Sequence, residues 1–316
     1  MNTKHRNQTI DVLRLVFSLC IIGIHLNLFK DMNTGLFRIF TEGVFRIGVP
    51  FYFITSGYFY AVKLHDREKT DKYLLRLFRI YVIFEAVDLL ARFLPGREKP
   101  PWFMLLRSFT TGQNQIYWYI ISLILTCAVC RRAWKRGWAK YLIAAGGVLY
   151  LFAMTFVSYS WLFPKPFLAD IVRIHKVVWA WPQAGFNESI LFLSIGVWLR
   201  QNNIRSKHAG IGVLVFTAAL LAESWFCQSK GAADANCCLS LIPVSVCVFL
   251  WALNHPDTIH IPHAGKMSLY VYMIHPYTNY LSYMMSNVSV VRYLISAGLS
   301  VICAFLIVMQ RNKAEV

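Results

Sequence analysis

The chain alternates between long runs of apolar residues and short polar stretches that are rich in Lys and Arg. A helix needs about 20 mainly apolar residues to cross the hydrocarbon core of a bilayer, and ten runs come close to this length. They cover approximately residues 10–29, 39–62, 72–94, 115–131, 140–158, 186–200, 209–227, 237–254, 267–286 and 290–310. The pattern predicts an all-α fold, a polytopic transmembrane bundle of about ten helices that forms a single domain over residues 1–316.

The cations between the runs predict the topology. They gather after the second, fourth and sixth runs and near the end of the chain, at residues 63–72, 131–140, 200–207 and 311–313. Because cytoplasmic loops carry an excess of Lys and Arg, both termini are expected in the cytoplasm. The polar start of the chain lacks a small-residue cleavage site, so the first run is expected to remain as a membrane anchor.

Composition excludes a soluble domain, since 57% of the residues are hydrophobic and only 15% are charged. A net charge of +17 would suggest nucleic acid in a soluble protein, but here the cations lie in short loops and no nucleic-acid partner is expected. The two longest outer loops, residues 95–114 and 158–185, are rich in Pro, Trp and Phe. Such loops are typical either of interfacial or re-entrant segments or of aromatic belts.

The cysteines and histidines do not form a metal-binding pattern. Cys127 and Cys130 end an apolar run, where packing explains them better than redox chemistry or zinc. Cys227, Cys237 and Cys238 flank a short outer loop, in which the sequence leaves a disulfide open. The histidines of the loop before the ninth run lack rigid helical spacing, so no metal is expected there.

Two ionisable residues, Arg14 and His25, lie inside the first apolar run. Each costs a few kcal/mol at membrane depth unless it faces protein or water, so a functional site is the default interpretation. Eleven residues of helix leave them roughly 20° apart around the axis and about 16 Å apart along it, on one stripe that suits a long anionic ligand. The alternative is a buried polar pair that fixes helix packing, and Asp11 is a local partner for Arg14.

Three further charged residues are candidates. Arg76 and Arg79 share a helix face near the predicted cytoplasmic side, where guanidinium groups either bind phosphate or anchor the topology. Glu188 has no partner nearby on its own helix. It is expected either to form a structural hydrogen bond across helices or to orient an imidazole or an acceptor hydroxyl.

Two proline-containing runs carry polar side chains. Pro50 is expected to kink the second helix, and Ser56 beside Gly57 indicates either a polar lining or tight helix packing. His275 comes directly before Pro276, where we expect a break in the helix. A histidine in such a run either packs as a satisfied structural residue or takes part in chemistry.

Motifs along nearly the whole chain resemble those of the acyltransferase-3 family of integral membrane acyltransferases. In chain order they are Arg14 and His25 separated by ten residues, GVPFYFITSGY, YLLRLFRIY, Tyr117-Trp118-Tyr119, LSIG and GKMSLYVYMIHP. Some members carry Trp-Ser-Leu followed by a Glu, which this chain lacks after Trp118. The departure indicates the short, stand-alone type without an appended esterase-like domain.

The resemblance implies transfer of an acyl group, often acetyl, from cytoplasmic acyl-CoA to a hydroxyl of an extracytoplasmic glycan or other cell-envelope acceptor. His25 would carry the transfer, either as general base or as a covalent relay. Arg14, Arg76 and Arg79 would hold the CoA phosphates. The residues expected to line a pore or to meet the acceptor are Ser56, Tyr117, Trp118, Glu188 and His275. No metal cofactor is expected.

A membrane transporter is the alternative function. Some relatives of the family are fused to amino-acid racemases and have been regarded as serine-uptake domains, and polar residues at the membrane midplane are typical of transporters. The sequence leaves the acceptor, the length of the acyl group and the oligomeric state open.

Overall fold

The computed structural model describes residues 7–92, 102–112, 117–163, 165–178, 185–232 and 234–314. Every regular element in these ranges is a helix, which confirms the all-α prediction, and each of the predicted runs contains one. Among the described residues, four helices are long and apolar enough to cross a bilayer: Gln8–His25, Ala139–Phe156, Ala209–Ser229 and Ser289–Lys313. The chain is therefore a membrane protein, whereas the count of about ten spans and the orientation of the termini stay predictions.

The chain divides into two compact units. The first comprises residues 1–52, 205–230 and 234–316, and the second comprises residues 53–204 and 231–233. Helix α3 (Gly48–Ala61) begins in the first unit and continues in the second.

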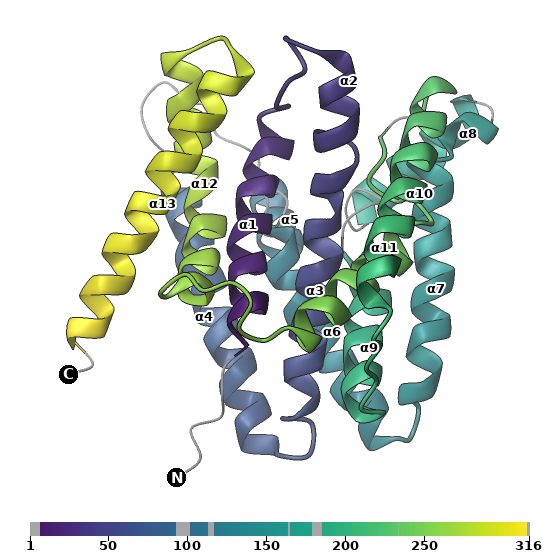
Figure 1. Cartoon of the computed structure of the whole chain (residues 1–316), viewed down its shortest axis with the longest axis vertical. Coiled ribbons are helices and arrows are strands. Elements are labelled where there is room, and N and C mark those ends of the chain that lie inside the picture. Colours follow the sequence, from purple (N-terminus) through teal and green to yellow (C-terminus); the bar gives the residue numbers. More distant parts are fainter. Residues whose placement is uncertain are drawn as a thin grey trace. The chain divides into compact units, whose positions relative to one another are not determined.

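The first unit is built mainly from long helices. It contains α1 (Gln8–His25), α2 (Thr34–Leu36), the π-helix η1 (Phe37–Thr41), the 3-10 helix η2 (Val44–Ile47), α10 (Ala209–Ser229), α11 (Leu241–Asn254), α12 (Ala264–Met285) and α13 (Ser289–Ala314). Helices α1, α12 and α13 pack side by side (Figure 1). Their apolar faces form a core of Val12, Leu15, Ile22, Leu26, Ala264, Met267, Val271, Ala304 and Val308.

Polar side chains fix where two of these helices begin. The side chain of Asn7 caps α1 by accepting a hydrogen bond from the backbone N–H of Ile10 at 2.9 Å. Asp31 caps α13 in the same way, because the backbone N–H of Ser289 donates to its carboxylate at 2.8 Å. Hydrogen bonds from the side chain and backbone of Ser289 also lower the pKa of Asp31.

The second apolar run is not one helix, so the predicted element over residues 39–62 is wrong at its start. The chain passes through η1 and η2, with Gly43 between them, before α3 begins at Gly48. Pro50 therefore lies in the first turn of α3, where a backbone N–H has no intrahelical acceptor. The kink expected at Pro50 is replaced by an interruption of the helix ahead of it.

The second unit holds the remaining helices, α4 (Arg67–Arg92), α5 (Trp102–Thr111), α6 (Trp118–Lys135), α7 (Ala139–Phe156), η3 (Ser160–Leu162), α8 (Lys165–Val178) and α9 (Phe186–Gln201). Helix α9 packs on α6 and α7, while α4 and α5 pack on α6. Short helices α5 and α8 occupy parts of the two long aromatic-rich stretches, for which interfacial or re-entrant segments and aromatic belts are the two interpretations.

Glycines allow α9 to approach its neighbours closely. A Cβ atom added at Gly57 of α3 would lie 2.1 Å from the backbone oxygen of Leu193, and one added at Gly196 would lie 2.1 Å from that of Ile54. Gly146 of α7 faces the backbone of Leu191 in a similar way. Close helix packing therefore explains Gly57, one of the two alternatives for this run.

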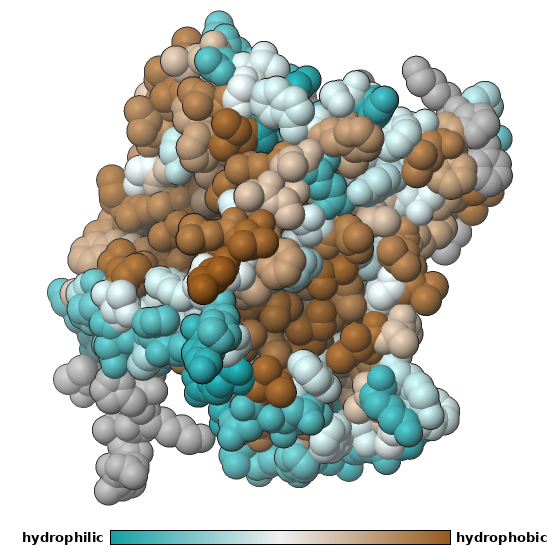
Figure 2. Space-filling view, turned by 45° about the vertical axis from the view of Figure 1, so that its right-hand side comes forward, coloured by the Kyte–Doolittle hydropathy of each residue, from teal (hydrophilic) through white to brown (hydrophobic). Residues whose placement is uncertain are grey.

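Apolar side chains remain at the surface after this packing. Figure 2 shows hydrophobic residues over much of the visible face, with hydrophilic residues gathered toward its upper and lower margins. Only 17% of the spanning window of α7, of α10 and of α13 is buried within the protein. Such faces fit helices that contact lipid.

We predict opposite effects of alanine at two adjacent glycines of α7. In Gly146→Ala the new Cβ would lie 2.5 Å from the backbone nitrogen of Leu191, which is unable to move aside, so the variant should lose about 1–3 kcal/mol of stability. Nothing lies within 4 Å of the corresponding atom at Gly147, so Gly147→Ala should be neutral or gain up to about 1 kcal/mol from helix propensity. Thermal unfolding of the two variants in detergent measures the difference. Equal melting temperatures would contradict the close α7–α9 approach.

Candidate functional site

Two histidines from distant parts of the sequence meet in the first unit. His25 is the last residue of α1, and His275 lies in the middle of α12. Their rings stack with centroids 5.4 Å apart and planes inclined by 26°. The sequence identified each residue separately, and the structure places them in contact.

The imidazole of His275 replaces a backbone hydrogen bond. In a regular helix the carbonyl of Tyr272 accepts from the residue four positions on, but Pro276 at that position has no N–H. Nδ1 of His275 lies 2.5 Å from this carbonyl oxygen and donates to it, because a carbonyl only accepts. Helix α12 therefore continues through Pro276, and the expected break is absent.

This hydrogen bond fixes the tautomer of His275. With the proton on Nδ1, Nε2 of the neutral ring carries a lone pair. Nε2 is buried and has no hydrogen-bond partner among the described residues. The stacked pair thus contains a ring nitrogen with a lone pair in a buried position, next to the half-buried ring of His25.

The turn after His25 holds the end of α1 in place. Asn27 and Phe29 adopt left-handed backbone conformations, with φ of 51° and 70°, which turn the chain sharply. The backbone N–H of Leu28 donates to the carbonyl of Gly23 at 2.9 Å, and the carbonyl of Leu28 accepts from Thr41 Oγ1 at 2.8 Å. These bonds tie the helix end to η1 and so position His25.

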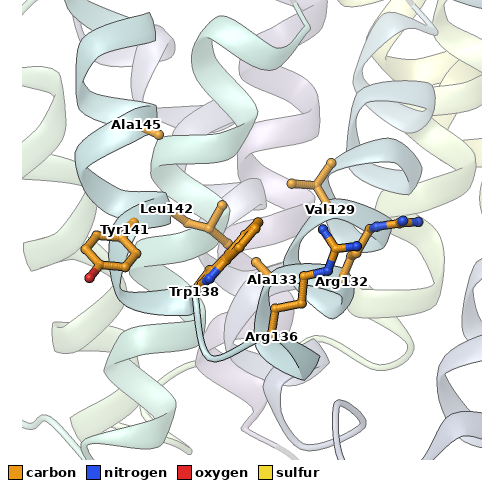
Figure 3. Close-up of a pocket in the computed structure, with 8 residues that line it drawn as sticks. All are labelled: Val129, Arg132, Ala133, Arg136, Trp138, Tyr141, Leu142 and Ala145. Carbon is orange, nitrogen blue, oxygen red and sulfur yellow. The ribbon is translucent and has the colours of Figure 1, made fainter.

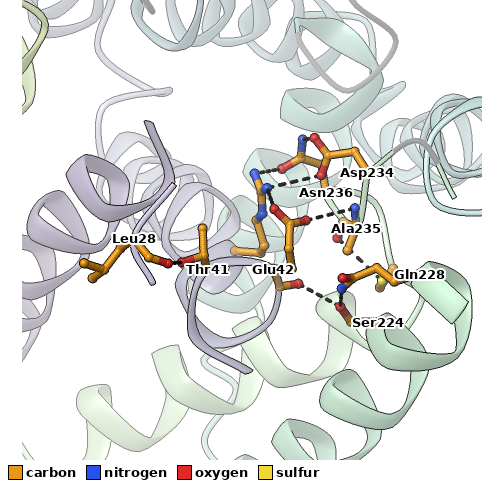
Figure 4. Close-up of polar contacts among 10 residues, drawn as sticks. Leu28, Thr41, Glu42, Ser224, Gln228, Asp234, Ala235 and Asn236 are labelled. Carbon is orange, nitrogen blue, oxygen red and sulfur yellow. Dashed lines mark hydrogen bonds and ion pairs between the residues drawn. The ribbon is translucent and has the colours of Figure 1, made fainter. Parts of the chain in front are cut away.

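A half-buried cluster of charged residues lies in the same unit, around Arg46 of η2. Its guanidinium contacts Glu42 at 2.6 Å and Asp234 at 3.2 Å, and donates a hydrogen bond to the side chain of Asn236. Figure 4 shows Glu42, Asp234 and Asn236 close together, and the backbone oxygen of Glu42 accepts a hydrogen bond from Ser224 of α10 at 2.8 Å. Burial raises the pKa of Asp234, an effect that the charge of Arg46 opposes.

Arg46 is a candidate that the sequence did not single out. It lies close enough to His25 for its charge to act on the imidazole. The sequence showed only the local pair with Glu42, four residues earlier, which gave a sufficient structural explanation. Its contact with Asn236 joins residues 190 positions apart, a relation that no local pattern reveals.

Arg14 lies on α1 as expected, with Asp11 as a local partner. The two side chains approach to 3.7 Å, and 28% of the Arg14 side chain is exposed. The backbone oxygen of Arg14 accepts a hydrogen bond from Tyr52. Arg76 and Arg79 lie on one exposed face of α4 in the second unit, so their meeting with Arg14 stays a prediction.

Four of the residues expected at a pore or acceptor site belong to the second unit. Ser56 Oγ lies 3.2 Å from the hydroxyl of Tyr119. Tyr117 is fully buried, and the ring of Trp118 contacts Phe53. Glu188 is buried in the first turn of α9. The structure thus brings His275 to His25, and it leaves a common site with the other four as a prediction.

The loop disulfide left open by the sequence is not formed. The structure holds Cys227, Cys237 and Cys238 as buried thiols. Cys127 and Cys130 are buried as well, as expected for packing residues.

We predict that the hydrogen bond of His275 and the missing donor of Pro276 are coupled. His275→Phe keeps a ring against His25 but leaves the carbonyl of Tyr272 without its donor, at a cost of about 1–3 kcal/mol. Pro276→Ala supplies a backbone N–H to the same carbonyl, so the double variant should recover most of the lost stability. A double-mutant cycle of thermal unfolding in detergent measures the coupling. Strictly additive effects would show that the two residues act independently.

Comparison with known proteins identifies the family of the chain. The sequence model of the acyltransferase-3 family, described as an acyltransferase domain, matches residues 7–309. The chain is also similar to an amino-acid racemase of Enterococcus faecalis, with 23% identity over 322 residues that cover 96% of this chain and 46% of the racemase. A serine/alanine racemase of Enterococcus gallinarum is 26% identical over 338 residues, which cover 95% of this chain and 46% of that protein.

The chain thus spans about half the length of these curated relatives. No solved structure matches it. The family match, in contrast, extends over nearly all of the chain. The chain belongs to the acyltransferase-3 family of acyltransferases.

Proposed function

We propose that the protein transfers an acyl group, acetyl in the simplest case, from acyl-CoA to a hydroxyl of an extracytoplasmic glycan or another cell-envelope acceptor. The observation that carries the proposal is the stacked pair of His25 and His275 inside a member of an acyltransferase family. A buried imidazole is suited to moving a proton or an acyl group.

In the direct route, His25 acts as general base. Its unprotonated ring nitrogen takes the proton of the acceptor hydroxyl while the hydroxyl oxygen attacks the thioester carbonyl. The tetrahedral intermediate then collapses, the carbon–sulfur bond breaks, and the leaving CoA sulfur takes the proton from the imidazolium. The products are an ester and free CoA thiol, and His25 returns to its starting state.

In the relay route, His25 is the nucleophile. Its nitrogen attacks the thioester carbonyl, the CoA thiolate leaves, and an acyl-imidazolium forms. The acceptor hydroxyl then attacks this acyl group, its oxygen bonds to the carbonyl carbon, and the carbon–nitrogen bond breaks. The hydroxyl proton passes to the thiolate or to solvent. This route suits a donor and an acceptor on opposite sides of the membrane.

The cationic residues are proposed to bind the acyl-CoA. Arg14 on the stripe of His25, together with Arg76 and Arg79, would bind the phosphates of CoA through charge-assisted hydrogen bonds. The assignment is supported by the family motifs and by the exposure of Arg76 and Arg79 on one face of α4. This assignment requires that α1 and α4 present their cations to the same cytoplasmic ligand. The membrane would be a bacterial-type inner membrane.

We predict that His25→Ala lowers acyl transfer at least about a hundredfold while the protein stays folded in the membrane, because a positioned base contributes a factor of that order or more. The assay supplies labelled acetyl-CoA to membrane vesicles and follows label in the glycan fraction. His255→Ala, at an exposed loop histidine, is the matched control and should retain activity. Wild-type transfer by His25→Ala would overturn the assignment. The His275→Phe and Pro276→Ala double variant then tests the second imidazole in a helix whose Tyr272 carbonyl keeps a donor.

Transport of a serine-like amino acid is the second candidate, supported by one specific observation. The curated relatives are named as racemases, and this chain corresponds to only about half of each. A membrane half that delivers an amino acid to a racemase half would account for that arrangement. In such a carrier His25 and His275 would bind the substrate or move a proton.

We predict that vesicles containing the wild-type protein take up no more labelled serine than vesicles containing His25→Ala. Uptake that depends on His25, without label transfer from acetyl-CoA, would favour the carrier over the enzyme. Empty vesicles define the background. The same preparations serve both assays, so differences in protein amount or membrane insertion affect the two readouts equally.

A further inference from the structure

A groove of about 390 Å³ lies between the end of α6 and the start of α7. It combines two arginines with apolar and aromatic side chains, and its lining comprises Val129, Arg132, Ala133, Arg136, Trp138, Tyr141, Leu142 and Ala145. Figure 3 shows the two guanidinium groups at one side of the groove, the indole of Trp138 beside them, and Ala145 farther along α7. All of these residues belong to the second unit.

The turn between the two helices is rigid. Helix α6 ends in a Schellman motif, in which Gly137 has φ of 71° and the N–H of Trp138 donates to the carbonyl of Ala133 at 2.8 Å. The N–H of Gly137 donates to the carbonyl of Trp134 at 3.1 Å. Glycine tolerates this left-handed conformation, so the sequence holds Arg136 and Trp138 in a fixed geometry around the turn.

The arginines of the groove are not neutralised by carboxylates among the described residues. Their neighbour Arg131 forms an ion pair with Asp71, whereas Arg132 and Arg136 form none there. The guanidinium of Arg136 lies over the ring of Trp138, with Cζ 5.2 Å from the ring centroid. Two positive charges four residues apart on one helix face therefore remain available to an anion.

The rest of the groove continues into the lipid-facing surface of α7. Trp138 is 55% exposed and Tyr141 is 59% exposed, although both are large aromatic residues. Helix α7 is one of the four candidate spans, and most of its window is not buried by protein. Aromatic residues beside cations at the end of a spanning helix mark the level of lipid headgroups, here on the predicted cytoplasmic side.

We propose that this groove binds an anionic phospholipid of the cytoplasmic leaflet. The lipid phosphate would accept hydrogen bonds from Arg132 and Arg136, and one acyl chain would lie over Val129, Leu142 and Ala145. A free phosphate would use the arginines alone and leave the apolar lining in water. An uncharged or zwitterionic lipid would fill the lining without neutralising the two charges. The combination of both features favours an anionic lipid.

Native mass spectrometry of the detergent-purified protein tests the proposal, with phosphatidylglycerol and phosphatidylcholine of identical chains as probes. The wild type should retain phosphatidylglycerol preferentially. Removal of each guanidinium in Arg132→Ala and Arg136→Ala should weaken this binding roughly fivefold, since a cation near the membrane surface contributes about 1 kcal/mol. Lys135→Ala is the matched control, because Lys135 is a cation on the same turn that does not line the groove. An equal loss in Lys135→Ala would overturn the site in favour of general surface charge.

A second variant tests the acyl chain and does not depend on the arginines. Ala145→Trp fills the groove with a bulky ring and keeps both charges, so it should also lose phosphatidylglycerol. The soluble headgroup glycerophosphoglycerol and inorganic phosphate should fail to raise the melting temperature, whereas phosphatidylglycerol should raise that of the wild type. Stabilisation by the soluble phosphates would show that the arginines bind a free phosphate group. Full lipid retention by Ala145→Trp would show that no acyl chain lies in the groove, and either result would refute the lipid site.

Discussion

Polar groups in the apolar parts of this chain have to be satisfied by the protein itself, because hydrocarbon offers them no hydrogen bonds. Pro276 in the middle of α12 has no N–H to donate to the carbonyl of Tyr272. The imidazole of His275 donates to this carbonyl instead. Glu223 of α10 also provides a hydrogen-bond partner for backbone groups. Its carboxylate accepts from the backbone N–H groups of Leu239 and Ser240, just ahead of α11, at 2.6 and 2.7 Å. A side chain that looks costly in the sequence is therefore often the partner of a backbone group.

The same requirement gives the candidate site its geometry. The hydrogen bond from His275 to the carbonyl of Tyr272 fixes the orientation and the tautomer of its ring. His25 therefore stacks on a ring that does not rotate. The sharp turn through Asn27 and Phe29 holds the other ring at the end of α1. Neither imidazole needs an acidic partner to be oriented. The absence of a Glu after Trp118, where some family members have one, is compatible with a site positioned in this way.

What the sequence predicted depends on the distance over which each signal acts. Periodicity and length located the helices, and the spacing of Arg14 and His25 placed both on α1, since these are local properties. The residue pair His25 and His275 joins opposite ends of the chain, so only the fold reveals it. The break predicted at Pro276 was wrong because the prediction considered only the lost N–H, whereas here a neighbouring side chain replaces the donor. Glu42 is a sufficient local partner for Arg46, so nothing in the sequence indicated the contacts of Arg46 with the loop before α11.

A helix end and a cluster of charged residues form the electrostatic surroundings of His25. As the last residue of α1, His25 lies among the carbonyls at the negative end of the helix dipole. Arg46 acts in the opposite direction, but Glu42 and Asp234 contact the same guanidinium and offset its charge. If either carboxylate were removed, the guanidinium of Arg46 would lose one of the two contacts that offset its charge. The two acids therefore allow an arginine to lie near the candidate base with its charge largely compensated.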